Sequence, residues 1–185
     1  MFLRRIKEYF FRMDDAAAMK RHVFYKIVDF KEEKNKYAIQ CINTSAIFYA
    51  QIGDIVNDTD ILYRLHPAQA CYIGMEYAEI FYKNQNHSTE KMNMKKFERI
   101  SFSRYGVYNI LYLDREGNIA FFNKKTKEEY LMNPKDIALR EELINRFDAQ
   151  QAFYIGLNAG FKLKSSVKKQ RKNCFLTPHY LKIIK

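Results

Sequence analysis

Three side chains that could do acid–base or nucleophilic chemistry lie close together in the sequence: His66, Cys71 and Glu76. An imidazole, a thiol and a carboxylate can act as base, nucleophile and acid when a fold brings them into contact. Their spacing matches no common catalytic or metal-binding motif, and the chain has no GxSxG, HExxH or CxxC motif and no glycine-rich phosphate loop. The sequence therefore predicts a protein without catalytic residues, metal ligands or a cofactor. A small enzyme with a site between two repeated units is the remaining enzymatic alternative.

These three residues belong to a stretch of fifteen residues that occurs twice. Residues 64–78 read RLHPAQACYIGMEYA, and residues 146–160, which begin 82 positions later, read RFDAQQAFYIGLNAG. Six of the fifteen positions are identical, and three more exchange one apolar residue for another. This similarity predicts a duplicated unit.

The second copy has Asp148, Phe153 and Asn158 where the first has the imidazole, thiol and carboxylate. A group found in one copy only can mark a functional site, or it can reflect drift, and the sequence leaves both interpretations open. Pro67 suits the first position of a helix, and Asp148 suits the cap before one. Because His66 aligns with this cap, we expect it at a helix start or on the surface rather than at a catalytic position.

Small residues recur at every fourth position in both copies, which places them on one face of a helix. They are Ala70, Gly74 and Ala78 in the first copy and Ala152, Gly156 and Gly160 in the second. Such a face lets another backbone approach closely, whereas Gly in a helix interior costs about 1 kcal/mol relative to Ala. The six residues are thus predicted to serve repeat packing, either of one helix on the other or of each helix on its own sheet.

Aromatic and β-branched runs separated by polar turns predict strands ahead of each copy, and a short helix follows them. In the first half the expected strands span 22–30, 37–42 and 46–50, and the expected helices span 55–65 and 67–82. Gly53 is expected to separate the last strand from the first helix. In the second half the expected strands span 99–105, 107–113, 119–122 and 128–132, and the expected helices 134–146 and 149–161.

The predicted fold class is therefore α+β: two tandem ββ(β)αα repeats forming one pseudo-two-fold body, with an N-terminal helix and a basic C-terminal tail. The predicted domains are residues 1–83 for the N-terminal helix and first repeat, 84–96 for a polar linker, 97–161 for the second repeat and 162–185 for the tail. The amphipathic residues 2–21 either cover the core or lie on a membrane surface.

The positive charge is concentrated near the C-terminal end of the chain. The formal net charge is +11, and residues 162–185 hold eight basic residues and no acidic one. The residues expected to bind an anionic partner are Lys162, Lys164, Lys168, Lys169, Arg171 and Lys172. Such a segment can meet an acidic protein, track nucleic-acid phosphates, lie on an anionic membrane or simply be solvated.

Three widely spaced cysteines and the absence of a signal-peptide pattern near Met1 favour a cytoplasmic location. Heavy use of Lys, Asn, Ile, Phe and Tyr suits an AT-rich, bacterial genome. By elimination we expect an interaction or adaptor protein that binds a protein partner through its repeat body and basic tail. The alternative is a nucleic-acid-binding or regulatory protein that uses the tail, and the third is the small enzyme with a site between the repeats. A membrane surface is a further candidate partner. The oligomeric state stays open.

Overall fold

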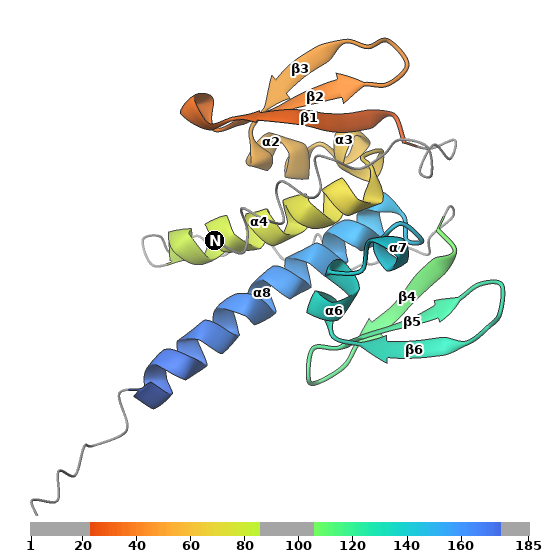
Figure 1. Ribbon diagram of the computed structural model, residues 1–185, viewed down its shortest axis with the longest axis vertical. Coiled ribbons are helices and arrows are strands. Elements are labelled where there is room, and N and C mark those ends of the chain that lie inside the picture. Colours follow the sequence, from red (N-terminus) through yellow and green to blue (C-terminus); the bar gives the residue numbers. More distant parts are fainter. Residues whose placement is uncertain (1–22, 86–105, 175–185) are drawn as a thin grey trace, which may run out of the picture.

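The structure is a computed structural model that describes residues 23–85 and 106–174 (Figure 1). The helix expected at 2–21, the strand expected at 99–105, most of the expected linker and the last eleven residues lie outside the described residues.

Each described half begins with three strands and ends with a long helix. The first half contains β1 (Tyr25–Lys31), the 3-10 turn η1 (Glu32–Lys34), β2 (Lys36–Cys41), β3 (Ile47–Ala50), α2 (Ile52–Asn57), α3 (Thr59–Tyr63) and α4 (Pro67–Gln85). The second contains β4 (Tyr108–Leu113), β5 (Ile119–Asn123), β6 (Glu129–Met132), α6 (Pro134–Ala138), α7 (Glu141–Ile144) and α8 (Ala149–Cys174).

The strands form two separate antiparallel sheets of three strands, ordered β1-β2-β3 and β4-β5-β6. This arrangement confirms the α+β class. Alternate residues of the central strands, such as Tyr37 and Ile39 on β2 or Ile119 and Phe121 on β5, point to the helices and are buried. The two sheets lie on opposite sides of the crossed pair α4 and α8 (Figure 1), and one hydrophobic core draws residues from both halves.

The same backbone contacts attach each sheet to the residues ahead of its long helix. The carbonyl of Arg64 accepts two successive amides at the start of β1 (2.9 and 3.1 Å), and the carbonyl of Arg146 accepts two at the start of β4 (2.7 and 3.1 Å). The first strand of each sheet also has a bulge, between Ile27 and Asp29 and between Ile110 and Tyr112. These bonds use main-chain oxygens, so they do not by themselves require arginine.

The single helix expected at 55–65 is instead α2 and α3, joined at Asp58. Asp58 adopts an extended conformation, and its carboxylate accepts the amides of Asp60 (2.9 Å) and Ile61 (3.2 Å), which caps α3. Gly53 lies inside α2 rather than ahead of it, because the Asp54 carboxylate accepts the Gln51 amide (3.0 Å) and so starts the helix three residues earlier than expected.

The helix expected at 134–146 is likewise divided into α6 and α7, because Arg140 adopts an extended conformation (φ −105°, ψ 97°). The prediction that Asn133 caps this region is correct, since its side chain accepts the Lys135 amide at 3.0 Å.

The long helix α8 does not end near Phe161, as the sequence led us to expect, but continues to Cys174. The boundary predicted at Lys162 between a second repeat and a tail therefore falls within a helix. The reason is compositional: residues 162–174 contain no Gly or Pro, and they include five Lys and one each of Arg, Gln and Leu, which favour helix. In the same way α4 runs to Gln85, two residues into the predicted linker.

Candidate binding surfaces

The predicted small residues lie where α4 crosses α8, and at Gly74 and Gly156 the two main chains touch. A Cβ atom added to Gly156 would lie 1.9 Å from the Cys71 carbonyl oxygen, and one added to Gly74 would lie 2.3 Å from the Phe153 oxygen. Gly160 has only slightly more room, because its added Cβ would lie 2.8 Å from the Met75 oxygen. This crossing positions both halves rather than performing chemistry.

The alanines of the two predicted faces are also interior. Ala70, Ala78 and Ala152 are each fully buried, and the Ala78 methyl lies 2.7 Å from the position a Cβ would take at residue 160. The six residues therefore form part of the core, and a partner in solution has no access to them.

The imidazole, thiol and carboxylate singled out in the sequence occupy three different environments. The Cys71 thiol is fully buried, and this burial raises its pKa to about 12, so it is a poor nucleophile near neutral pH. His66 immediately precedes α4, and its carbonyl accepts the Ala70 amide at 2.9 Å. This is the helix-start position that the alignment with Asp148 predicted, where the Asp148 carboxylate accepts the Gln151 amide at 2.9 Å.

Glu76 joins a buried polar cluster that the sequence analysis missed. The Tyr37 hydroxyl donates a hydrogen bond to the Glu76 carboxylate, and Tyr72 contacts the same group. Burial, and then the nearby carboxylate, raise the pKa of Tyr37 and of Tyr72 above the usual value. Both phenols therefore stay protonated and stabilise a half-buried carboxylate, which is a structural role.

This cluster is absent at the equivalent positions of the second half. The residues 82 positions after Tyr37 and Glu76 are Ile119 and Asn158. The side-chain amide of Asn158 donates instead to the Tyr154 carbonyl (2.8 Å). The sequence contained one signal of this cluster, which was the Glu–Asn difference between the two copies. It did not indicate the partner, because Tyr37 is 39 residues from Glu76.

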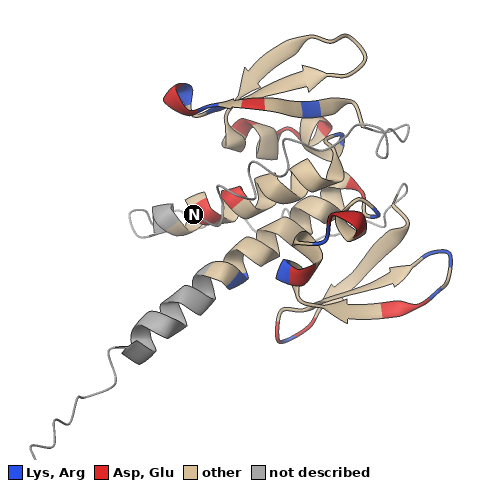
Figure 2. Cartoon of the chain, in the orientation of Figure 1, with Lys and Arg blue, Asp and Glu red and all other residues tan. Residues whose placement is uncertain are grey.

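The outer face of the second sheet exposes large apolar side chains. Tyr112 and Leu131 are 58% and 57% exposed and flank the small, buried Ala120 in one cross-strand row. Leu111, at the bulge of β4, is also exposed. Neither β4 nor β5 carries a charged residue, and Figure 2 shows that much of the charge of this sheet gathers at its turns. We call this set, Leu111, Tyr112 and Leu131 around Ala120, the apolar face.

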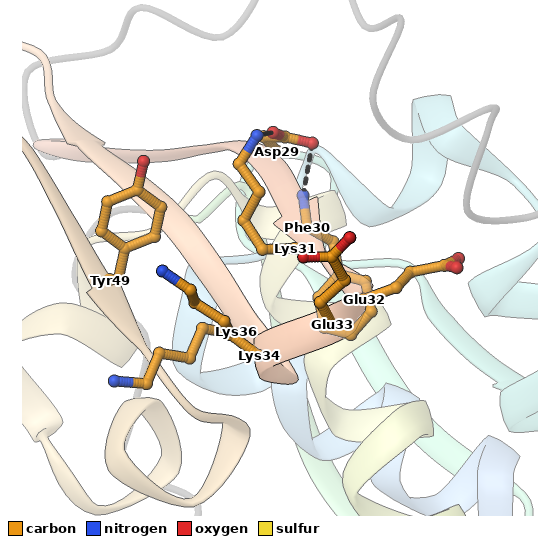
Figure 3. A pocket seen from close by; sticks show the side chains of 8 residues that line it. All are labelled: Asp29, Phe30, Lys31, Glu32, Glu33, Lys34, Lys36 and Tyr49. Atoms are coloured by element: carbon orange, nitrogen blue, oxygen red, sulfur yellow. Dashed lines mark hydrogen bonds and ion pairs between the residues drawn. The ribbon is translucent and has the colours of Figure 1, made fainter.

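The first sheet presents a more polar outer face with a hollow of about 680 Å³ at the tip of its β1–β2 hairpin. Eight residues line it: Asp29, Phe30, Lys31, Glu32, Glu33, Lys34, Lys36 and Tyr49. Figure 3 shows Tyr49 on one side, with the amino groups of Lys34 and Lys36 on that same side and the Glu32 carboxylate extending the opposite way.

Of the basic residues predicted to bind an anionic partner, Lys162 contacts the body of the protein. Its ammonium donates to the Asn118 side chain at 3.1 Å, and its stem lies against Gly117 in the β4–β5 turn. Lys164, Lys168, Lys169, Arg171 and Lys172 follow on the backbone of α8, and their side chains lie outside the described residues.

Within residues 23–85 and 106–174, no group of three or more His, Cys, Asp or Glu side chains could hold a metal ion. Nor does this described part of the chain contain a helix that is long and apolar enough to cross a membrane. Comparisons of the chain with models of protein families, with curated proteins and with solved structures found no match.

Proposed function

We propose that this is a non-catalytic, intracellular interaction protein that binds a protein partner through the outer surface of its sheets. The observation that carries the proposal is the apolar face, where Leu111, Tyr112 and Leu131 stay exposed. Contiguous exposed apolar side chains of this size are uncommon on soluble monomers and often mark interaction sites. Tyr is also among the residues that contribute most to binding at interfaces. The free thiols of Cys41 and Cys71 fit a reducing compartment.

We also propose that the two halves are tandem copies of one ββ(β)αα unit. Equivalent backbone contacts support this. The Cys41 amide donates to the Ala46 carbonyl, and 82 positions later the Asn123 amide donates to the Glu128 carbonyl. From β2 onward every element of the second half begins close to 82 residues after its counterpart. The bulges in β1 and β4 add a feature that the fifteen-residue similarity does not include.

Capture of partners from a lysate of the source cell tests the protein-binding proposal. The bait is the full chain, compared with Leu131→Lys on the apolar face and with Leu139→Lys as the matched control. Leu139 is equally exposed (56%) but caps the end of α6 and belongs to neither sheet. We expect a protein captured by the native chain to be lost with Leu131→Lys and retained with Leu139→Lys, at unchanged melting temperature. Equal capture by both variants would refute the proposal.

A second candidate function is nucleic-acid binding by α8, and the continuation of this helix through the basic segment favours it. On a helix, Lys164, Lys168 and Arg171 recur at intervals of four and three, which places them on one side. Such a row can follow a phosphate backbone, and its affinity then falls with salt.

Binding of a mixed-sequence single strand at several salt concentrations tests this second candidate. Neutralising Lys164, Lys168 and Arg171 to Gln would remove three phosphate contacts and reduce the slope of log affinity against log salt by about 2. The same change at Lys124, Lys125 and Lys127 in the β5–β6 turn is the control for net charge. If both triple variants lower the slope equally, α8 has no specific part in binding.

A further inference from the structure

The hollow at the tip of the first sheet combines a flat aromatic ring with positive charge. Tyr49 is 53% exposed, and its cross-strand partner is Ala38. Because Ala has a small side chain, the outer face of the sheet has open space beside the ring. An exposed aromatic ring over a flat strand surface is the setting in which proteins stack nucleic-acid bases.

Two lysines of the hollow, Lys31 and Lys36, lie on the same face of the sheet as this ring. Lys31 and Lys36 are directly opposite in the β1–β2 pairing, and Lys36 precedes the inward-facing Tyr37, so Lys36 points outward like Ala38. Tyr49 pairs with Ala38 and is therefore the diagonal neighbour of Lys36, at a Cα separation of roughly 7–8 Å. The ring and the ammonium group can thus contact adjacent parts of one small ligand.

The ion pairs of the hairpin leave two of these ammonium groups available. Lys31 is held by Asp29, with 2.6 Å between the charged atoms, and this pairing lowers the pKa of the Asp29 carboxyl. Among the residues that the structure describes, Lys34 and Lys36 make no ion pair, and both extend to the Tyr49 side of the hollow (Figure 3). Lys34 and Lys36 therefore make the Tyr49 side positive, whereas Glu32 makes the opposite side negative and Glu33 lies between the two (Figure 3).

The equivalent place on the second sheet lacks this chemistry. Leu131 lies 82 positions after Tyr49, and Asn118 lies 82 positions after Lys36. The Asn118 side chain is already engaged by Asp114 (3.0 Å) and by Lys162 (3.1 Å). Two sheets with the same strand order thus differ at this point, so the ring and the lysines are not requirements of the fold.

We propose that this hollow binds a nucleotide unit, with the base stacked on Tyr49 and the phosphate held by Lys34 and Lys36. Its volume of about 680 Å³ falls within the range of roughly 300–1,000 Å³ that is usual for small-molecule sites. The unit is either a free nucleotide or one residue of a single strand, since both present the same base and phosphate. This site goes beyond the proposed protein-binding function and does not depend on it.

The test measures binding of the full chain to adenosine monophosphate, to adenosine, to inorganic phosphate and to a twelve-residue oligo(dT). We expect Tyr49→Ala to lower the affinity of the oligonucleotide or of the mononucleotide about tenfold, because stacking on one ring contributes roughly 1–3 kcal/mol. Tyr49→Phe keeps the ring and retains the affinity. Lys34→Gln with Lys36→Gln reduces the salt slope for the single strand by about 0.7, the value for loss of contact with one phosphate.

Matched controls are Tyr63→Ala, which removes an exposed ring (39%) on α3, and the pair Lys125→Gln with Lys127→Gln in the β5–β6 turn. These change the same kinds of group away from the hollow, so the affinity and the salt slope should stay close to those of the native chain. Tighter binding of the mononucleotide than of the single strand identifies a free nucleotide as the ligand, and the reverse identifies a nucleic acid. Absence of binding to all four probes overturns the proposal. So does oligonucleotide binding that Tyr49→Ala leaves unchanged, and in that case nucleic-acid binding by α8 would still stand.

Discussion

Replacing Gly156 by Ala should destabilise the protein more than the same replacement at Gly74 or Gly160, the other described glycines of α4 and α8. The new Cβ would lie 1.9 Å from the Cys71 carbonyl oxygen and 2.7 Å from its carbonyl carbon. Ordinary contact begins at 3.4 Å, so α4 and α8 would have to separate by about 1.5 Å at this point. The atoms in the way are main chain in the second turn of α4, which cannot move without moving the helix.

The expected loss is about 3 kcal/mol or more in the free energy of unfolding. Overpacking a core costs roughly 1–3 kcal/mol and sometimes more, and a gap of 0.5–1 Å already removes a quarter to a half of each van der Waals contact along the crossing. The better helix propensity of Ala returns only about 1 kcal/mol. For a chain of this size, 3 kcal/mol corresponds to a fall in Tm of roughly 6–12 °C.

Urea unfolding followed by circular dichroism measures this loss, and Gly53→Ala is the matched control. A Cβ at Gly53 meets no atom within 4 Å, so the same substitution there should leave stability unchanged or raise it by up to about 1 kcal/mol. Gly74→Ala should cost nearly as much as the change at Gly156, and Gly160→Ala less. A Gly156→Ala protein within 1 kcal/mol of the native chain would refute the close crossing of the two backbones.

Three further predictions concern buried polar groups. Tyr37→Phe removes the hydroxyl that donates to Glu76 and should cost about 1–3 kcal/mol by urea unfolding, whereas a neutral result would mean that water replaces the phenol. Burial raises the pKa of Cys71 to about 12, so the folded state keeps a proton that the unfolded state loses near pH 9. The contribution of this protonated thiol to the free energy of unfolding is therefore fully present below about pH 9. It falls by up to about 1.4 kcal/mol per pH unit as the pH rises toward 12. In alkaline unfolding curves, the free energy of unfolding of Cys71→Ala should decline less steeply. Gln69→Leu removes the buried amide that bonds both the N–H and the carbonyl of Ile27 (2.9 Å each) and should cost about 2–4 kcal/mol, since it leaves two main-chain groups unpaired; a loss below 1 kcal/mol would contradict this role.

Short-range patterns in the sequence predicted the strands well, because aromatic and β-branched runs such as residues 107–113 pair with strands that are adjacent in the chain. They predicted helix breaks poorly. Asp58 ends one helix and caps the next through its own side chain. Because the pattern of apolar residues continues across Asp58, it predicts a single helix. The length of α8 was underestimated because a run of lysines was interpreted as a tail, although Lys is a good helix former.

The candidate sites were harder to predict because they depend on pairs that are distant in the chain. The apolar face requires the registers of three strands, which join Tyr112 to Ala120 and Ala120 to Leu131. The nucleotide hollow requires Tyr49 to lie diagonally from Lys36, and no local pattern contains both. That the two halves arose by duplication, and that the basic residues of α8 bind a partner, stay predictions.

The crossing of α4 and α8 also has a consequence for how the chain folds during synthesis. The face of α4 that carries Gly74 is covered by residues about 82 positions later, so the first sheet and α4 leave the ribosome before their cover exists. At roughly 5–20 residues per second, this delay lasts about 4–16 s, far longer than a helix or hairpin takes to form. During that interval the nascent first half exposes the small, apolar face of α4 that carries Gly74 to the surrounding solution. Its protection by chaperones, or its slow docking once α8 emerges, should therefore set the yield of native protein more than the stability of either sheet.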